Sequence, residues 1–190
     1  MCRLRTERFF WSLKMKNFFN SEQSGRSMVE MLGVLAIIGV LSVGGISGYS
    51  KAMAKFKLTK AQDQLTMLLM NIRTAYATSP SYAGLSASSA VDYNLAPTDM
   101  ITGSTLHNAF GGGVTLSTSN NDLNFSIKFE GLGKETCASL ASTDWGTDGL
   151  VSIALTTGSK NVAELPYSLP AAFSGCSATT ASNSITWTYY

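Results

Sequence analysis

The strongest constraint in this 190-residue sequence is an uncharged and largely apolar run of twenty residues, from Met31 to Ser50. Glu30 precedes the run and Lys51 follows it. A helix of about 20 residues is long enough to cross a hydrocarbon core that is roughly 30 Å thick, whereas the apolar part of a secretory signal has only about 7 to 15 residues. The sequence therefore predicts a transmembrane helix near its N-terminus.

Composition argues against an enzyme and against a nucleic-acid-binding protein. Charged residues make up 14% of the chain, against about 25% in typical soluble domains. The 14 Lys and Arg nearly balance the 12 Asp and Glu, so the chain lacks the strongly basic character of a nucleic-acid binder. We expect no catalytic residues, no cofactor and no metal, and we interpret the single histidine, His107, as a loop residue without a function.

The seven residues from Ser24 to Glu30, with the sequence SGRSMVE, resemble the processing signal of type IV prepilins. In that family a dedicated prepilin peptidase cleaves after the glycine on the cytoplasmic side and methylates the new N-terminus. The resemblance implies that Gly25 precedes the cut, that Arg26 becomes the first mature residue, and that Glu30 is the family's glutamate at position five. Arg26 departs from the large apolar residue that is usual at the first mature position.

The resemblance also implies a cytoplasmic leader that is removed. The leader comprises residues 1–25, or eleven residues if translation starts at Met15 rather than at Met1. Its five basic residues outnumber its two acidic ones, which favours a cytoplasmic N-terminus. The expected partners are the prepilin peptidase, the pilus assembly machinery in the inner membrane, the membrane itself before assembly, and other copies of the chain. We expect a precursor in the bacterial inner membrane and a product in an extracellular pilus, built as a helical homopolymer.

Glu30, Gly44 and Gly48 are the residues that we expect to matter for assembly. A carboxylate at the edge of a hydrocarbon segment costs on the order of 2.5 to 3.5 kcal/mol unless it is paired, and the resemblance implies that Glu30 pairs with the free amino group of a neighbouring subunit. The alternative is that its side chain reaches the lipid headgroups. Gly44 and Gly48 have the G-x-x-x-G spacing that allows close packing of helices in lipid, although glycine is also simply frequent in membrane helices.

One continuous helix is predicted from Ser27 to Thr78, because no proline occurs before Pro80. At the standard rise it is roughly 78 Å long. Residues 26–50 would form its transmembrane or filament-core half, and residues 51–79 its amphipathic half. A seam of apolar residues at alternating spacings of three and four marks the face that we expect to cover a small domain: Ala54, Leu58, Ala61, Leu65, Leu68, Ile72 and Ala75.

Residues 80–190 are predicted to form a globular α+β part on the periplasmic or surface side. Alternation of apolar and polar residues predicts strands around 114–116, 123–129, 151–155 and 185–189, and the turn Asn120-Asn121-Asp122 would join the first two. Each strand has one apolar face, which is typical of an antiparallel sheet covered on one side; the seam of the long helix is the expected cover. We expect Trp187 and Tyr189 in the core, an irregular connector over residues 80–113, and a flexible turn at Gly111-Gly112-Gly113.

Cys137 and Cys176 are the even pair that remains once Cys2 leaves with the leader. In a domain outside the inner membrane such a pair indicates a disulfide, the alternative being two reduced thiols. It would join a turn or short helix over 134–142 to an irregular segment before the last strand. The C-terminal disulfide loop resembles the D-region of type IVb pilins, and the stretch from Gly131 to Gly146 resembles the branch that includes thin conjugative pilus subunits.

We therefore predict a type IV pilin, most like the type IVb class, that polymerises into a pilus used in adhesion, aggregation or conjugation. The alternatives are a type II secretion pseudopilin, which shares the processing signal, and a membrane-anchored binding module that never polymerises. The sequence leaves open whether the chain is a major or a minor subunit.

Overall fold

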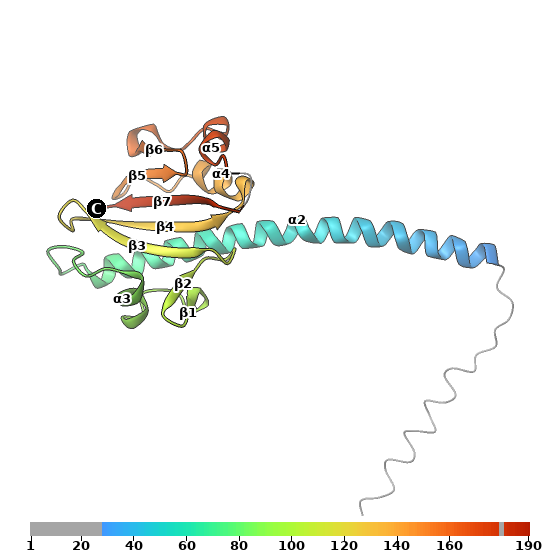
Figure 1. Cartoon of the computed structure of the whole chain (residues 1–190), viewed down its shortest axis with the longest axis horizontal. Helices are drawn as coiled ribbons and strands as arrows, with labels where there is room; N and C mark the ends of the chain where they lie inside the picture. Colours follow the sequence, from blue (N-terminus) through green and yellow to red (C-terminus); the bar gives the residue numbers. More distant parts are fainter. Residues whose placement is uncertain (1–27, 179–180) are drawn as a thin grey trace, which may run out of the picture. The chain divides into compact units, whose positions relative to one another are not determined.

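The computed structural model describes residues 28–178 and 181–190 (Figure 1). The chain divides into two compact units, with the boundary between Ser50 and Lys51.

Helix α2 (Met28–Ala75) runs through 48 residues without a break. It confirms the predicted continuous helix and ends three residues before the predicted end, just ahead of a segment rich in Ser and Pro. In the second unit the middle of the predicted seam is buried, but its two ends, Ala54 and Ala75, are exposed. The seam that covers the sheet is therefore shorter than predicted. Its fully buried members are Ala61, Leu65, Leu68 and Ile72.

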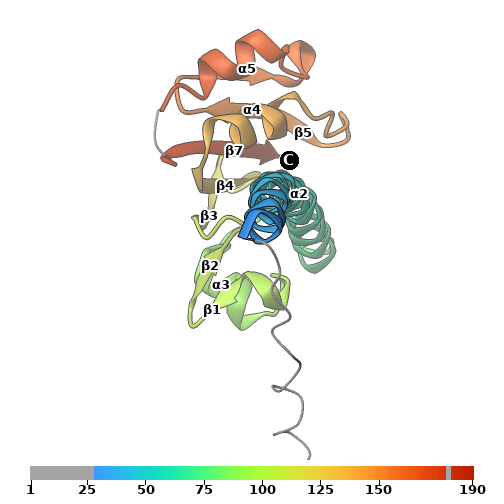
Figure 2. The ribbon, with the colours of Figure 1, turned by 90° about the vertical axis from the view of Figure 1, so that its right-hand side faces the viewer.

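The second unit contains one antiparallel sheet of seven strands in the order β1-β2-β3-β4-β7-β5-β6. This confirms the predicted α+β architecture. Viewed along α2, the sheet extends from β1 to β5 with the green second half of the helix along one side (Figure 2). The strands are β1 (Ile101–Thr102), β2 (Thr105–His107), β3 (Gly113–Ser119), β4 (Asn124–Leu132), β5 (Leu150–Leu155), β6 (Gly158–Asn161) and β7 (Asn183–Tyr189).

Short helices surround the sheet. They are α3 (Ala87–Asp92), α4 (Lys134–Ser142) and α5 (Leu169–Gly175), with single 3₁₀ turns η1 (Thr98–Met100) and η2 (Val162–Glu164). The expectation of an irregular connector over 80–113 was wrong, because this segment forms α3, η1, β1 and β2. Ser86 and Ser89 cap α3 reciprocally, each side chain bonding the other residue's backbone N–H.

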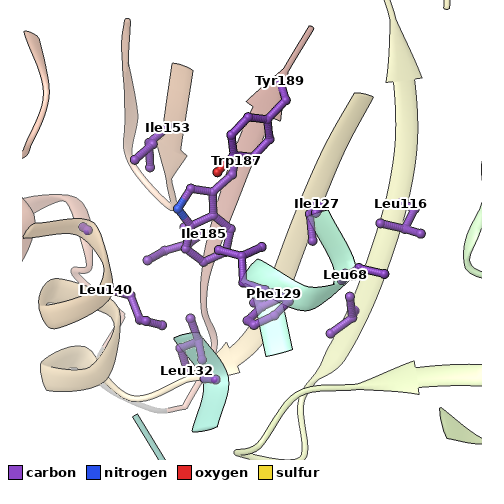
Figure 3. Packing of buried hydrophobic residues seen from close by; sticks show 14 of the residues in the cluster. Leu68, Leu116, Ile127, Phe129, Leu132, Leu140, Ile153, Ile185, Trp187 and Tyr189 are labelled. Atoms are coloured by element: carbon purple, nitrogen blue, oxygen red, sulfur yellow. The ribbon is translucent and has the colours of Figure 1, made fainter. Parts of the chain in front are cut away.

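The core lies between the apolar face of the sheet and the helices. On β7 the side chains of Ile185, Trp187 and Tyr189 are buried, as predicted, and the intervening residues face the other side. Figure 3 shows Leu68 of α2 and Leu140 of α4 directed toward the cluster around Phe129 and Trp187. The rings of Phe129 and Trp187 meet edge to face at 5.4 Å between centroids. One face of the sheet is thus covered by helices.

Two local expectations were wrong. Leu123 does not share the apolar face of β4 but is 52% exposed, because Asn120, Asn121 and Asp122 all have positive φ angles and the turn takes one more residue before β4 begins. His107 lies in strand β2 rather than in a loop, and its Nε2 is 3.1 Å from the hydroxyl of Thr105.

Within the expected flexible turn, Gly112 makes a close backbone contact, and Gly113 is the first residue of β3. Gly112 packs directly against the backbone of Glu130 and Gly131, so that a Cβ at Gly112 would overlap the carbonyl oxygen of Glu130. The buried side chain of Asn108 fixes this approach from both sides. Its Nδ2 donates to the Glu130 carbonyl (2.8 Å), and its Oδ1 accepts from the backbone N–H of Gly112 (3.2 Å).

A polar cluster ties η1 to α2. Lys60 Nζ lies 2.9 Å from Asp99 Oδ2, and Gln64 Nε2 donates to the same oxygen at 2.9 Å. The hydrogen bond from Lys60 is the main cause that lowers the pKa of Asp99; the hydrogen bond from Gln64 adds to it, and partial burial opposes it. The carboxylate is therefore more acidic in the folded chain than in the unfolded one.

This cluster predicts a loss of stability in acid. A carboxyl group whose pKa is lowered by folding stabilises the folded chain. This stabilisation is fully present above the pKa of the unfolded chain, about 4, and is lost as the pH falls through the lower pKa of the folded chain. Replacing Asp99 with asparagine is expected to lower the free energy of unfolding at pH 7 by less than about 1 kcal/mol, because the pair is 40% exposed. The variant should also lose stability less steeply than the parent below about pH 4. Urea unfolding across pH tests this, with Asp63→Asn, an exposed aspartate on α2, as the control; an equal acid response of both variants would contradict it.

Candidate functional site

The predicted processing site lies outside the described residues, because Gly25 and Arg26 precede residue 28, as do Cys2 and the rest of the leader. Glu30 lies in the first turn of α2 and is exposed. A carboxylate at this position is favoured by the partial positive charge of the helix N-terminus.

The first unit presents an apolar surface. Every described residue from Met28 to Ser50 is exposed, including large side chains such as Val40 at 75% and Ile46 at 69%. Helix α2 contains the only segment in the described chain that is long and apolar enough to cross a membrane. An apolar surface of this size in a chain is typical of contact with lipid or with another protein.

The glycines of this unit pack against no other part of the described residues, 28–178 and 181–190. Added Cβ atoms at Gly44 and Gly48 would meet nothing within 4 Å, and the same holds for Gly33, Gly39 and Gly45. Their small size therefore leaves room on the outer surface of the helix.

Cys137 and Cys176 form a disulfide, as predicted, with 5.9 Å between their Cα atoms. Cys137 lies in α4 and Cys176 caps the C-terminus of α5, so the bridge joins two helices. The expected irregular segment before the last strand is therefore partly helical. Both cysteines are fully buried and belong to the same core as Trp187.

The side chain of Arg73 makes a contact that the sequence does not predict. Arg73 Nη2 donates to the carbonyl of Asp148 at 3.0 Å, and its guanidinium carbon lies 5.3 Å from the ring centre of Tyr189. Gly149, with φ of +74°, leaves the space that this guanidinium fills. Burial raises the pKa of Tyr189 to about 12, and the positive charge of Arg73 partly offsets the rise. Nothing in the local sequence signals this contact, because it joins segments about 75 residues apart.

Comparison with known proteins agrees with this architecture. The family model described as PilS N terminal matches residues 56–190. The chain is similar to the major structural subunit of the bundle-forming pilus of Escherichia coli O127:H6 (strain E2348/69 / EPEC), with 26% identity over 129 residues, which are 66% of this chain and 67% of that protein.

Two solved structures share the fold. A type IVb pilin from Salmonella typhi superposes with a TM-score of 0.54 at 19% identity, over 71% of this chain and 98% of that one. TcpA, a type IV pilin from Vibrio cholerae El Tor biotype, gives 0.51 at 16% identity, over 70% and 99%. Since the family model covers most of the sequence and the sheet, helix and disulfide are in place, the chain belongs to the PilS family and is a type IV pilin of the type IVb-like kind.

Proposed function

We propose that this pilin is stored in the bacterial inner membrane through its apolar helix and then polymerises with other copies into a surface pilus. The observation that carries the proposal is the contrast between the two units. The described residues from 28 to 50 bury none of their side chains, whereas the unit that begins at Lys51 has a complete core. An apolar helix of this kind is stable in lipid, or against identical helices that replace the lipid.

The glycines support contact between helices. Because no atom of the described residues lies within 4 Å of an added Cβ at Gly44 or Gly48, we infer that the close approach that they permit is to another copy of the helix. We propose that residues 26–50 of many copies form the core of the filament. Residues 51–79 would then form the amphipathic half of the helix, and residues 80–190 the surface of the filament. A pilus subunit as relative supports self-association as the mode of assembly.

Processing by a prepilin peptidase at the Gly25–Arg26 bond is part of this proposal. N-terminal sequencing of protein sheared from the cell surface tests it directly. The expected result is a methylated Arg26 as the first residue. Recovery of the full-length chain in membranes only, from cells that display no fibres, would contradict both the processing and the function.

Glu30 is proposed to pair with the amino group of Arg26 in a neighbouring subunit. Replacing Glu30 with valine is expected to abolish piliation while the protein still accumulates in the membrane, because valine removes the charge that only an assembled neighbour neutralises. Electron microscopy and quantification of sheared pilin measure the effect. Glu164→Val, at an exposed glutamate of η2, is the control and should leave assembly intact; normal piliation of the Glu30 variant would remove this role.

We propose that the pilus is used in adhesion, aggregation or conjugation. The two alternatives predict different images. In electron micrographs of cells, a type II secretion pseudopilin would give no long surface fibres, and a binding module that does not polymerise would give no fibres of any length. Long fibres that disappear when the gene is deleted would exclude both.

A further inference from the structure

Lysines are concentrated directly after the apolar run of α2. Residues 51–60 contain four lysines and no acidic residue, so their formal charge is +4, whereas residues 61–190 contain four basic and nine acidic residues. In the proposed orientation these lysines lie on the side of the membrane away from the cytoplasm. Basic residues on that side do not help to orient a transmembrane helix, so the topology of the chain does not explain them.

The length of the apolar run places these lysines at the boundary of a membrane. The twenty uncharged residues from Met31 to Ser50 span about 30 Å as a helix, which is also the usual thickness of a hydrocarbon core. Helix α2 continues without a break to Ala75, so Lys51 is the first residue beyond the core. Tyr49, which is 67% exposed, indicates the same depth, because tyrosine is enriched at membrane–water interfaces.

Three of the four lysines have no ion-pair partner in the described chain. Lys60 Nζ pairs with Asp99, but no carboxylate among residues 28–178 and 181–190 lies within ion-pair distance of Lys51, Lys55 or Lys57. All three side chains are exposed. Lys51 and Lys55 are one helical turn apart, so their like charges repel each other unless an anion lies near them.

These three lysines lie on different sides of the helix. With 3.6 residues per turn, Lys57 lies roughly 160° from Lys55 and roughly 120° from Lys51 around the helix axis. A protein that approached from one direction could not contact all three. Lipid headgroups surround a helix that crosses a membrane, so an anion on a lipid is available to each lysine whatever its direction.

The headgroup layer also lies within reach along the helix axis. Lys51 and Lys57 are about 9 Å apart in that direction, and the headgroup layer is roughly 5 to 8 Å thick on each side of a bilayer. Side chains of a helix lean toward its N-terminus, which here means toward the apolar run. A lysine can lay its methylene groups along apolar surface while its ammonium group stays at the polar level.

We propose that Lys51, Lys55 and Lys57 bind the phosphate groups of anionic lipids in the outer leaflet of the inner membrane while the subunit is stored there. This inference rests on the proposed function and adds a lipid class to the stored state. A negative membrane surface strengthens the binding of each nearby lysine about fivefold. The contact fixes the depth of the helix, and the phosphates have to be released before the subunit enters a filament.

The reactivity of each lysine in the full chain measures this contact. The chain is placed in lipid nanodiscs, which leave both membrane faces accessible, and is methylated with formaldehyde and a borane reductant, both uncharged. Lys51, Lys55 and Lys57 should react about fivefold more slowly in discs of equal phosphatidylcholine and phosphatidylglycerol than in discs of phosphatidylcholine alone. Lys134, which is exposed on α4, should react equally in both, as mass spectrometry of the peptides will show.

Lipid retention tests the same contact with substitutions. The discs that contain both lipids are dissolved in mild detergent, and native mass spectrometry counts the lipids that stay bound to the chain. The wild-type chain should retain phosphatidylglycerol preferentially, and Lys51→Gln with Lys55→Gln should reduce this preference at least about fivefold. Lys134→Gln with Lys160→Gln changes the net charge equally and should leave the preference unchanged. Both variants should keep the disulfide on a non-reducing gel.

Three results would overturn the inference. Equal reaction rates of the three lysines in both kinds of disc would show that they do not contact anionic lipid. Protection by inorganic phosphate added to the phosphatidylcholine discs would indicate a site for a free anion instead of a headgroup. Equal lipid retention by the wild-type chain and the Lys51→Gln, Lys55→Gln variant would indicate that other residues select the lipid. The proposed function fails separately, if cells that express the wild-type chain display no fibres.

Discussion

Replacing Cys137 with serine is expected to lower the free energy of unfolding by about 4 kcal/mol. The disulfide closes a loop between residues 39 apart in sequence, and a cross-link over about 40 residues restricts the unfolded chain by roughly that amount. Small domains have only about 5 to 15 kcal/mol in total, so much of the stability of the second unit depends on this one bond. Urea unfolding of the full chain in detergent, followed by tryptophan fluorescence, measures the change.

Matched variants distinguish the contribution of the disulfide bond to stability from the contributions of the two individual side chains. Cys176→Ser should give the same loss, and the double variant should lose little more than either single one, because both remove the same cross-link. Additive losses would instead indicate that each buried sulfur stabilises the core by packing, since both cysteines are fully buried. Unchanged unfolding of the single variants would contradict the prediction.

Replacing Gly112 with alanine is expected to cost about 3 kcal/mol, at the upper end of the range for overpacked sites. The added methyl group would overlap the Glu130 carbonyl, and a Cβ at Gly131 would likewise lie 2.8 Å from the Gly112 Cα. The obstacle is backbone, and the Asn108 side chain bonds both segments, so neither segment can move away without breaking a buried hydrogen bond.

Thermal unfolding compares this variant with Gly158→Ala. Gly158, in β6, has nothing within 4 Å of an added Cβ and lies in the same sheet, so its substitution should change stability by no more than about 0.5 kcal/mol. If the two variants unfold at the same temperature, the contact between Gly112 and Glu130 does not contribute to stability.

Strong periodicity explains which parts of the fold were predictable. The long helix follows from apolar residues that recur at spacings of three and four over several turns. The β3–β4 hairpin and the burial of Trp187 follow from alternation of apolar and polar residues along the strands. The short elements α3 and β6 contain too few residues to show a period. Their conformation depends on contacts with distant parts of the chain, which propensity alone does not reveal.

The disulfide was predictable from the sequence because cysteine is rare in this chain. Only two cysteines remain after the leader, so their pairing followed directly, and the disulfide confirms it. Gly25, Arg26 and Glu30 were predicted from the resemblance to type IV prepilins, and their roles stay predictions. The contact between Arg73 and Asp148 was not predictable, because it depends on how the chain folds back on itself.

The position of β7 in the sheet makes the order of synthesis important. β7 lies between β4 and β5, although it follows both in the sequence. Until residues 183–189 emerge, the earlier strands form two separate groups whose facing edges lack a partner, and such edges tend to bind other chains. A truncated subunit therefore lacks the strand that joins the two groups, and we expect proteases to remove it before it joins a fibre. We therefore expect assembly only from copies that have been translated through β7.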